Sequence, residues 1–184
     1  MQETRQGSVT LVLGGARSGK SRYAQQLAEQ SRHVVFVATA KASDEEMRIK
    51  IERHRKDRPQ EWPTIEEPLD LPKVLAEHEL GNDVILVDCL TIFAANLLEV
   101  EGEDSDSIDR RVEALCERLR TAQCHVVLVS NEVGSGVVPE YAVGCRYRDL
   151  LGEINQKVAR VADDVVLMVA GLPLALKGHV EVML

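Results

Sequence analysis

The fold of this chain is decided by one stretch near its beginning, Leu11-Val12-Leu13-Gly14-Gly15-Ala16-Arg17-Ser18-Gly19-Lys20-Ser21. An apolar run over 9–13 leads directly into G-x-x-x-x-G-K-S, and a helical pattern follows, which is the context in which this motif forms a P-loop. In a P-loop, backbone N–H groups turn inward to cradle phosphate oxygens, and the following helix points its positive end at the same place. An ordinary glycine-rich turn is the alternative, but the flanking strand and helix favour the P-loop. The sequence therefore predicts a nucleoside triphosphate site.

The residues of this motif have separate expected roles. Nucleotide contacts are predicted at Gly14, Gly15, Ala16, Arg17, Ser18, Gly19, Lys20 and Ser21. Lys20 is expected to reach the β- and γ-phosphates and to act in catalysis, and the Ser21 hydroxyl is expected to bind Mg²⁺.

A second nucleotide element is the run Val84-Ile85-Leu86-Val87-Asp88, in which four apolar residues precede an acid. This pattern is typical of a buried strand that delivers a carboxylate to the edge of a sheet, and in P-loop proteins that carboxylate holds Mg²⁺, directly or through water. A strand that ends in Asp is also common because Asp caps the next helix well. After a P-loop, we favour the metal role for Asp88. Thr91, just beyond, could cap the helix or touch the same site.

Short apolar runs alternate with longer amphipathic ones along the chain. Strands are predicted over 9–13, 33–38, 84–88, 126–130 and 165–170, and helices over 20–30, 44–58, 69–78, 90–98, 108–122 and 148–162. Continuous Val, Ile and Leu runs suit parallel strands that helices cover on both faces. The prediction is an α/β fold with a doubly wound, mostly parallel sheet. Residues 1–7 are expected to form a loose tail, 8–184 a single catalytic domain, and the acidic stretch 99–107 a solvated loop.

Composition excludes some classes of protein. The formal net charge of −8 argues against a general nucleic-acid or membrane surface, because both need basic patches. The four cysteines have no metal-binding spacing, there is no signal peptide, and no apolar run is long enough to cross a bilayer. We therefore expect a cytoplasmic protein with reduced thiols.

The segment 43–62 stands out for its charge. Ser43-Asp44-Glu45-Glu46 has capping-box spacing, so a helix is predicted to begin there. The basic side chains that follow are Arg48, Lys50, Arg53, Arg55, Lys56 and Arg58. A solvated helix with i,i+4 ion pairs is one interpretation. A phosphate site is the other, because arginines clamp phosphate oxygens in a fixed fork geometry.

His54 lies within this basic segment, on the predicted helical face shared with Met47 and Ile51. Partial shelter among cations favours a neutral imidazole, which is a competent nucleophile toward phosphorus. The alternative is a structural histidine, which is the commoner case for a lone histidine on a helix.

The run over 126–136, VVLVSNEVGSG, is a third strand that ends in polar residues. Asn131 and Glu132 could meet substrate, water or metal at the edge of the sheet, and the glycines would make the following loop mobile. The alternative is a turn, with Asn131 as its cap and positive φ at Gly134 and Gly136. Composition and spacing leave both interpretations open.

Taken together, these motifs resemble one family, the bifunctional adenosylcobinamide kinase / adenosylcobinamide-phosphate guanylyltransferases of cobalamin biosynthesis. The pieces that carry the resemblance are GGARSGKS (14–21), VATA (37–40), DEEM (44–47), IERHR (51–55) with Arg58-Pro59 and Trp62, TIEEP (64–68), DCLT (88–91), NLL (96–98), SNEVG (130–134) through Val138-Pro139-Glu140, RDL (148–150), Gly152 with Asn155-Gln156, Ala162-Asp163 and VAGLP (169–173). They cover almost everything from 9 to 177, and no motif position departs from the pattern.

The resemblance implies two reactions. In the first, ATP or GTP phosphorylates the aminopropanol hydroxyl of adenosylcobinamide. In the second, GTP gives GMP to adenosylcobinamide phosphate, with adenosyl-GDP-cobinamide and pyrophosphate as products. The resemblance further implies a RecA-like P-loop fold and a homotrimer.

The same resemblance assigns site residues. It places the guanylyl group on a catalytic histidine that matches His54. The implied nucleotide contacts are the P-loop, Ala38, Thr39, Ala40, Arg55, Lys56, Asp57, Arg58, Glu66 and Asp88, with Mg²⁺ between Ser21 and Asp88. The remaining alternatives are a single-function P-loop small-molecule kinase, which needs no nucleophilic histidine, and a non-catalytic nucleotide switch with a partner-binding loop at 130–136.

Overall fold

The computed structural model describes residues 7–41, 48–49, 55, 58–102 and 104–180. They form a seven-stranded sheet with the strand order β3-β2-β4-β5-β1-β6-β7. The strands are β1 (Val9–Gly14), β2 (Val34–Ala38), β3 (Thr64–Glu66), β4 (Val84–Asp88), β5 (His125–Asn131), β6 (Asp164–Val169) and β7 (Leu172–Lys177). In this part of the chain every strand pairing is parallel except that of β6 with β7. The predicted doubly wound, mostly parallel α/β sheet is confirmed.

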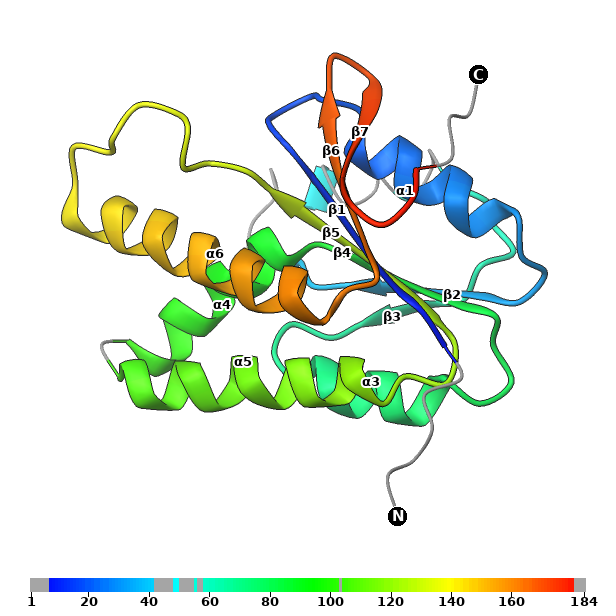
Figure 1. The fold of residues 1–184 in the computed structure, drawn as a ribbon. Helices are drawn as coiled ribbons and strands as arrows, with labels where there is room; N and C mark the ends of the chain where they lie inside the picture. The colour runs from blue at the N-terminus through cyan, green and yellow to red at the C-terminus, as the bar shows by residue number, and fades with distance from the viewer. Residues whose placement is uncertain (1–6, 42–47, 50–54, 56–57, 103, 181–184) are drawn as a thin grey trace.

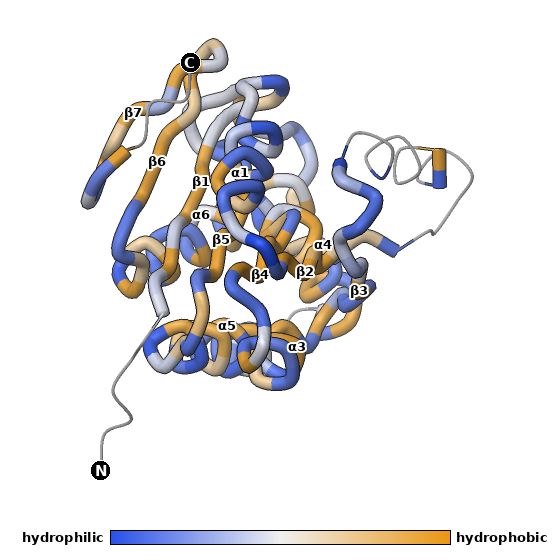
Figure 2. The backbone as a smooth tube through the Cα atoms, turned by 90° about the vertical axis from the view of Figure 1, so that its right-hand side faces the viewer, coloured by the Kyte–Doolittle hydropathy of each residue, from blue (hydrophilic) through white to orange (hydrophobic). Residues whose placement is uncertain are grey.

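Helices cover both faces of the sheet (Figure 1). They are α1 (Lys20–Glu29), α3 (Leu71–His78), α4 (Leu90–Glu101), α5 (Ser105–Arg120) and α6 (Ala142–Val161). Helix α1 packs on one face, and α3, α4, α5 and α6 pack on the other. In Figure 2 the hydrophobic colour concentrates on the central strands between the two helical layers. Among the described residues, no helix combines the length and apolar character needed to cross a lipid bilayer.

The two faces of the sheet follow from the alternation of side chains along each strand. In β4, Leu86 packs toward α1 and Val87 packs toward the opposite layer. In β5, Leu128 packs toward the opposite layer and Val129 toward α1. All four side chains are buried. The same alternation extends to the last residue of each strand. It therefore determines which side chains at the strand ends lie on the face of the sheet that α1 covers.

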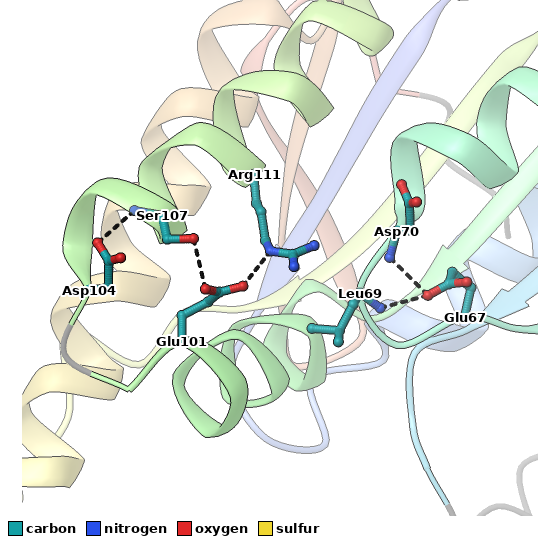
Figure 3. Close-up of polar contacts among 7 residues, drawn as sticks. All are labelled: Glu67, Leu69, Asp70, Glu101, Asp104, Ser107 and Arg111. Carbon is teal, nitrogen blue, oxygen red and sulfur yellow. Dashed lines mark hydrogen bonds and ion pairs between the residues drawn. The ribbon is translucent and has the colours of Figure 1, made fainter.

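The segment 99–107 is not the solvated loop that its acidic composition predicts. Helix α4 extends to Glu101, and α5 begins at Ser105. Asp104 caps α5 by accepting the backbone N–H of Ser107 (3.0 Å). Glu101 accepts the Ser107 hydroxyl (2.7 Å) and Nε of Arg111 (2.6 Å), as Figure 3 shows. The acids are helix caps and ion-pair partners, so the expected loop is wrong.

Two strands and the start of one helix are also absent from the sequence prediction. Strand β3 has only three residues, and β7 contains Pro173 and leaves its three leucines exposed. Helix α6 begins at Ala142, before the predicted start at 148, and its first residues, Ala142 and Val143, are exposed. At the N-terminus, Gly7 is not loose as predicted, because its N–H donates to the carbonyl of Ala122 (3.0 Å).

Candidate functional site

The loop between β1 and α1 has the shape of a phosphate cradle. Gly19 precedes α1 in a left-handed conformation (φ 95°), and no side chain caps the helix. The first N–H groups of α1 are therefore available to a ligand. Lys20 lies across the loop with Nζ donating to the carbonyl of Gly15 (3.0 Å). Ser18 Oγ is buried and has no hydrogen-bond partner among the described residues.

Close packing explains two of the glycines. A Cβ on Gly14 would come 2.3 Å from Ser18 Oγ and 2.9 Å from the carbonyl oxygen of Met168. A Cβ on Gly19 would come 3.3 Å from Cα of Gly171. Gly171 lies in the turn between β6 and β7, and its N–H donates to the carbonyl of Ser18 (3.0 Å). The β6–β7 turn is thus part of the P-loop's support, and the local sequence around Gly171 gives no signal of that contact.

Asp88 ends β4, and Lys20 lies within its electrostatic reach. Burial lowers the pKa of the Lys20 ammonium, and the carboxylate of Asp88 opposes this shift. The N-cap of α4 is Cys89, and no side-chain hydrogen bond caps that helix. The residue at the N-cap position of α4 is therefore Cys89 and not Asp88.

Thr39 anchors the backbone beside Asp88. Its side chain is fully buried, with Oγ1 donating to the carbonyl of Cys89 (2.8 Å) and accepting the N–H of Cys89 (3.0 Å). Asn96 of α4 donates to the carbonyls of Thr39 (2.9 Å) and Pro68 (3.1 Å). The Thr39 hydroxyl is therefore occupied by protein backbone, while Ala38 and Ala40 lie on either side of it.

The oxygen ligands at this edge suit a Mg²⁺ ion that keeps some of its waters better than a metal ion bound only by protein side chains. The described residues contain no group of three or more His, Cys, Asp or Glu that could hold a metal ion. Ser21, in the first turn of α1, and Asp88 offer one hydroxyl and one carboxylate. Mg²⁺ commonly keeps several waters and binds one or two protein groups together with substrate phosphates.

The basic segment reaches the site through Arg58. His54, Lys56 and Asp57 lie outside the described residues, and Arg55 is helical and exposed. Arg58 is buried, and its guanidinium lies over the ring of Phe36 with 3.7 Å between Cζ and the ring centroid. Burial and the charge of Arg55 lower the pKa of Arg58, while Asp88 opposes the shift. This part of the segment therefore adjoins the edge of the sheet that carries Asp88.

A shallow hollow lies beside Arg58. It has a volume of about 290 Å³ and is lined by Arg55, Arg58, Pro59, Gln60, Glu61, Trp62, Pro63 and Thr64. Glu66, the remaining predicted nucleotide contact, ends β3 at the margin of the sheet and is exposed. Glu66 pairs in register with Ala38 of β2, so it is near the predicted contacts that follow β2. Two strands, β2 and β4, separate it from β5.

The end of β5 differs from the predicted turn. Glu132 donates its N–H to the carbonyl of Gly14 (3.0 Å), and its Oε1 accepts the N–H of Gly134 (2.6 Å). The positive-φ glycines of the described chain do not include Gly134 or Gly136, so this part of the turn prediction is wrong. Thr91 neither caps α4 nor points into an open site: its Oγ1 accepts the N–H of Asn131 (2.9 Å).

The parallel sheet, the phosphate cradle after β1 and the carboxylate at the end of β4 define a P-loop NTPase. A solved structure described as a prototypical ATPase from the type III secretion system of pathogenic bacteria is similar in fold, with a TM-score of 0.58 and 12% identity over 88% of this chain and 51% of that chain. The chain thus spans about half the length of that ATPase. A protein from Pyrococcus horikoshii is similar with a TM-score of 0.53 and 9% identity over 98% of this chain and 91% of that one.

Sequence comparison defines the family within that class. The family described as cobinamide kinase / cobinamide phosphate guanyltransferase matches residues 10–176. Two relatives are both named bifunctional adenosylcobalamin biosynthesis protein. The first, from Pseudomonas aeruginosa, is 46% identical over 92% of this chain and 97% of its own length. The second, from Escherichia coli, is 38% identical over 91% of this chain and 98% of its own length. The chain belongs to the cobinamide kinase / cobinamide phosphate guanyltransferase family, which confirms the predicted family and its two enzyme activities.

Proposed function

We propose that this chain performs both reactions of its family and links the second to a covalent His54–GMP intermediate. In the first reaction, ATP or GTP phosphorylates the hydroxyl of adenosylcobinamide. In the second, Nε2 or Nδ1 of His54 forms a bond to the α-phosphorus of GTP, the bond from that phosphorus to the α–β bridging oxygen breaks, and pyrophosphate leaves. A phosphate oxygen of adenosylcobinamide phosphate then attacks the same phosphorus and releases the imidazole.

One observation carries this proposal: Arg58 is buried against Phe36 and within electrostatic reach of Asp88. Only three residues lie between Arg58 and His54 in the sequence, and Arg58 is held at the edge of the sheet that also carries the P-loop. Arg55 adds a second positive charge close to Arg58. Guanidinium groups at this edge would stabilise the negative charge that develops on the phosphates during transfer.

The P-loop supports the nucleotide part of the proposal. The uncapped start of α1, the left-handed Gly19 and Lys20 offer the donors that bind the β- and γ-phosphates. We assign Mg²⁺ to Ser21 and Asp88, where it would neutralise phosphate charge and orient the γ-phosphoryl group. The N–H of Gly171 donates to the carbonyl of Ser18, and Gly14 pairs with Met168 of β6, so the loop is held close to β6.

The test is to incubate the protein with Mg²⁺ and GTP labelled at the α-phosphate, denature it, and compare the wild type with His54→Ala. A label that survives alkali, is lost in acid and is absent from the variant supports the phosphoramidate on His54. Absence of label from both proteins, with GTP binding intact, would overturn it and favour the single-function kinase. A matched control is His78→Ala, because His78 ends α3 away from the P-loop.

The quaternary structure is a separate proposal. The family resemblance implies a homotrimer, and sedimentation equilibrium at micromolar concentration tests it. A single species of three times the chain mass of 20.4 kDa is expected; a monomer over the whole concentration range would contradict the proposal.

A further inference from the structure

The backbone of Asn131, at the end of β5, is held on both sides by side chains. Its N–H donates to Oγ1 of Thr91 (2.9 Å), and its carbonyl accepts Nδ2 of Asn155 (3.0 Å). Asn155 is itself buried in α6, where its Oδ1 accepts the hydroxyl of Ser130 (2.6 Å). Two helices therefore fix the position of this one residue.

Alternation along β5 gives the direction of the Asn131 side chain. Val129 packs toward α1, and Ser130 is directed to the opposite layer, where it bonds Asn155. The next side chain, that of Asn131, therefore leaves the sheet on the face of α1. By the same argument Asp88 lies on this face, because Val87 before it packs toward the opposite layer.

The register places Asn131 between the phosphate cradle and the metal carboxylate. Asn131 is the direct partner of Gly14 across the β1–β5 pairing, and Val129 is the partner of Asp88 across the β4–β5 pairing. The residue after Asn131 is also bonded to the carbonyl of Gly14 (3.0 Å). At this edge β5 lies between β1 and β4. The side chain of Asn131, the last residue of β5, therefore faces the space between Lys20 and Asp88.

Other polar side chains at this edge are already engaged. Thr39 bonds the backbone of Cys89, Thr91 bonds Asn131, and the carboxylate of Glu132 takes the N–H of Gly134. The side-chain amide of Asn131 makes no hydrogen bond within the part of the chain that the structure describes, although its backbone N–H and carbonyl are both bonded. A held backbone with an unused amide is the arrangement that a preorganised donor to a ligand needs.

We infer that Asn131 is a catalytic residue of the phosphoryl-transfer step, with its Nδ2 donating a hydrogen bond to an oxygen of the γ-phosphoryl group. The inference rests on the proposed kinase activity. In that step the acceptor hydroxyl oxygen bonds to the γ-phosphorus, the bond to the β–γ bridging oxygen breaks, and the nucleoside diphosphate leaves with the electron pair. The hydroxyl proton passes to solvent. The amide stabilises the charge on the transferred oxygens.

The γ end of the nucleotide is favoured over the α end for a simple reason. P-loops hold the β- and γ-phosphates, and the metal carboxylate marks the γ side. A donor between these two groups meets the transferred phosphoryl group rather than the α-phosphorus, which His54 attacks. The amide therefore serves the kinase reaction more than the guanylylation of the enzyme.

The experiment measures both half-reactions in Asn131→Ala and in the nearly isosteric Asn131→Asp. Phosphorylation of adenosylcobinamide by γ-labelled ATP should lose about 100-fold in kcat with alanine, the effect of removing one preorganised donor. Aspartate should lose more, because it replaces the donor with a negative charge. The KM for ATP and the rate of labelling by α-labelled GTP should stay within about threefold of the wild type. The matched control, Asn82→Ala, removes an amide that bonds the carbonyl of His78 and should leave kcat unchanged.

The outcomes separate this inference from the proposed function. If the wild type phosphorylates adenosylcobinamide and both variants keep a kcat within threefold, Asn131 has no catalytic role. A rise in KM at unchanged kcat would also overturn the inference, because it indicates binding alone. An equal loss in both half-reactions would indicate a distorted site. If the wild type itself fails to phosphorylate the substrate, the proposed function fails first. Retained nucleotide affinity in Asn131→Asp shows that the variant is folded.

Discussion

The guanidinium of Arg58 stacks on the ring of Phe36, with 3.7 Å between Cζ and the ring centroid. Phe36 belongs to β2 and is buried on the face that α1 covers. The contact therefore ties the chain that follows the basic segment to the sheet itself, on the face where the nucleotide is proposed to bind. Because Arg58 is buried, water screens the charge of its guanidinium only in part.

Removing this stack should slow guanylylation. Arg58→Ala loses both the ring contact and the charge, and Arg58→Lys keeps the charge but not the planar group that stacks. We expect both variants to label with α-labelled GTP at least about tenfold more slowly, with a loss of about 0.5–2 kcal/mol in the free energy of unfolding. Arg32→Ala is the control, because Arg32 is exposed at the opposite end of β2. Labelling of Arg58→Ala at the wild-type rate would show that the stack has no part in transfer.

Gly14 and Gly15 should respond differently to the same substitution. A Cβ at Gly14 would approach Ser18 Oγ to 2.3 Å, whereas a Cβ at Gly15 meets nothing within 4 Å. Gly14→Ala should therefore lose about 1–3 kcal/mol of stability and most of its ATP affinity. Gly15→Ala should change stability by less than about 0.5 kcal/mol. Urea unfolding and ATP titration of the two variants check this contrast, and equal behaviour of the pair would count against the packing argument.

Thr39 should be important for its hydroxyl rather than for its size. Thr39→Val keeps the shape but leaves the N–H of Cys89 without its partner and removes one of the two donors to its carbonyl, at a cost of about 1–3 kcal/mol in the free energy of unfolding. Thr39→Ser keeps both hydrogen bonds and should lose much less. Thermal unfolding of both variants, together with the Mg²⁺ concentration needed for half-maximal activity, tests the role. If valine were tolerated as well as serine, Thr39 would not hold the backbone beside Asp88.

Asp83 gives a prediction about pH. Its carboxylate accepts the backbone N–H of His33 (2.9 Å) and of Arg32 (3.2 Å), and the bond from His33 is the main reason that its pKa lies below the ordinary value. Because the folded pKa is the lower one, the ionised form stabilises the fold above the unfolded pKa of about 4. That stabilisation is lost as the pH falls through the folded pKa.

The measurement compares the wild type with Asp83→Asn by urea unfolding at several pH values. The wild type should be more stable at pH 7, and the difference should shrink steadily below about pH 4. Glu29→Gln, an exposed substitution at the end of α1, is the control for a general change in charge. A difference between wild type and Asp83→Asn that is the same at pH 7 and pH 3 would show that the carboxylate is not responsible.

The sequence predicted the structure best for strands whose apolar runs are uninterrupted. The buried strands β1, β4 and β5 have uninterrupted apolar runs, and their predicted bounds are right to within one residue at each end. Strand β7 escaped prediction because its leucines are exposed on the sheet margin, where no core imposes a pattern. The acidic stretch 99–107 was misread because Asp104 and Glu101 serve as cap and ion-pair partner, and composition alone does not distinguish these roles from solvation.

Some residues of the candidate site could likewise be predicted from the sequence, and others could not. The P-loop and Asp88 could be predicted because each is a local motif at the end of a strand. The contacts between Gly171 and Ser18, and between Arg58 and Phe36, join residues that are distant in the sequence, and no local pattern encodes them. Thr39 was expected near the nucleotide from family resemblance, yet its hydroxyl bonds Cys89. His54 lies outside the described residues, so its role stays a prediction.

The pairing of β1 also sets the order in which a growing chain can complete its phosphate cradle. Strand β1 is made first, but its two neighbours in the sheet are β5, which begins at His125, and β6, which begins at Asp164. On the ribosome, the P-loop motif therefore has neither neighbouring strand beside it until β5 has been synthesised. The turn at Gly171 that supports Ser18 is made later still. The P-loop, although translated before the strands that flank it, is thus among the last parts of this fold to acquire its folded surroundings.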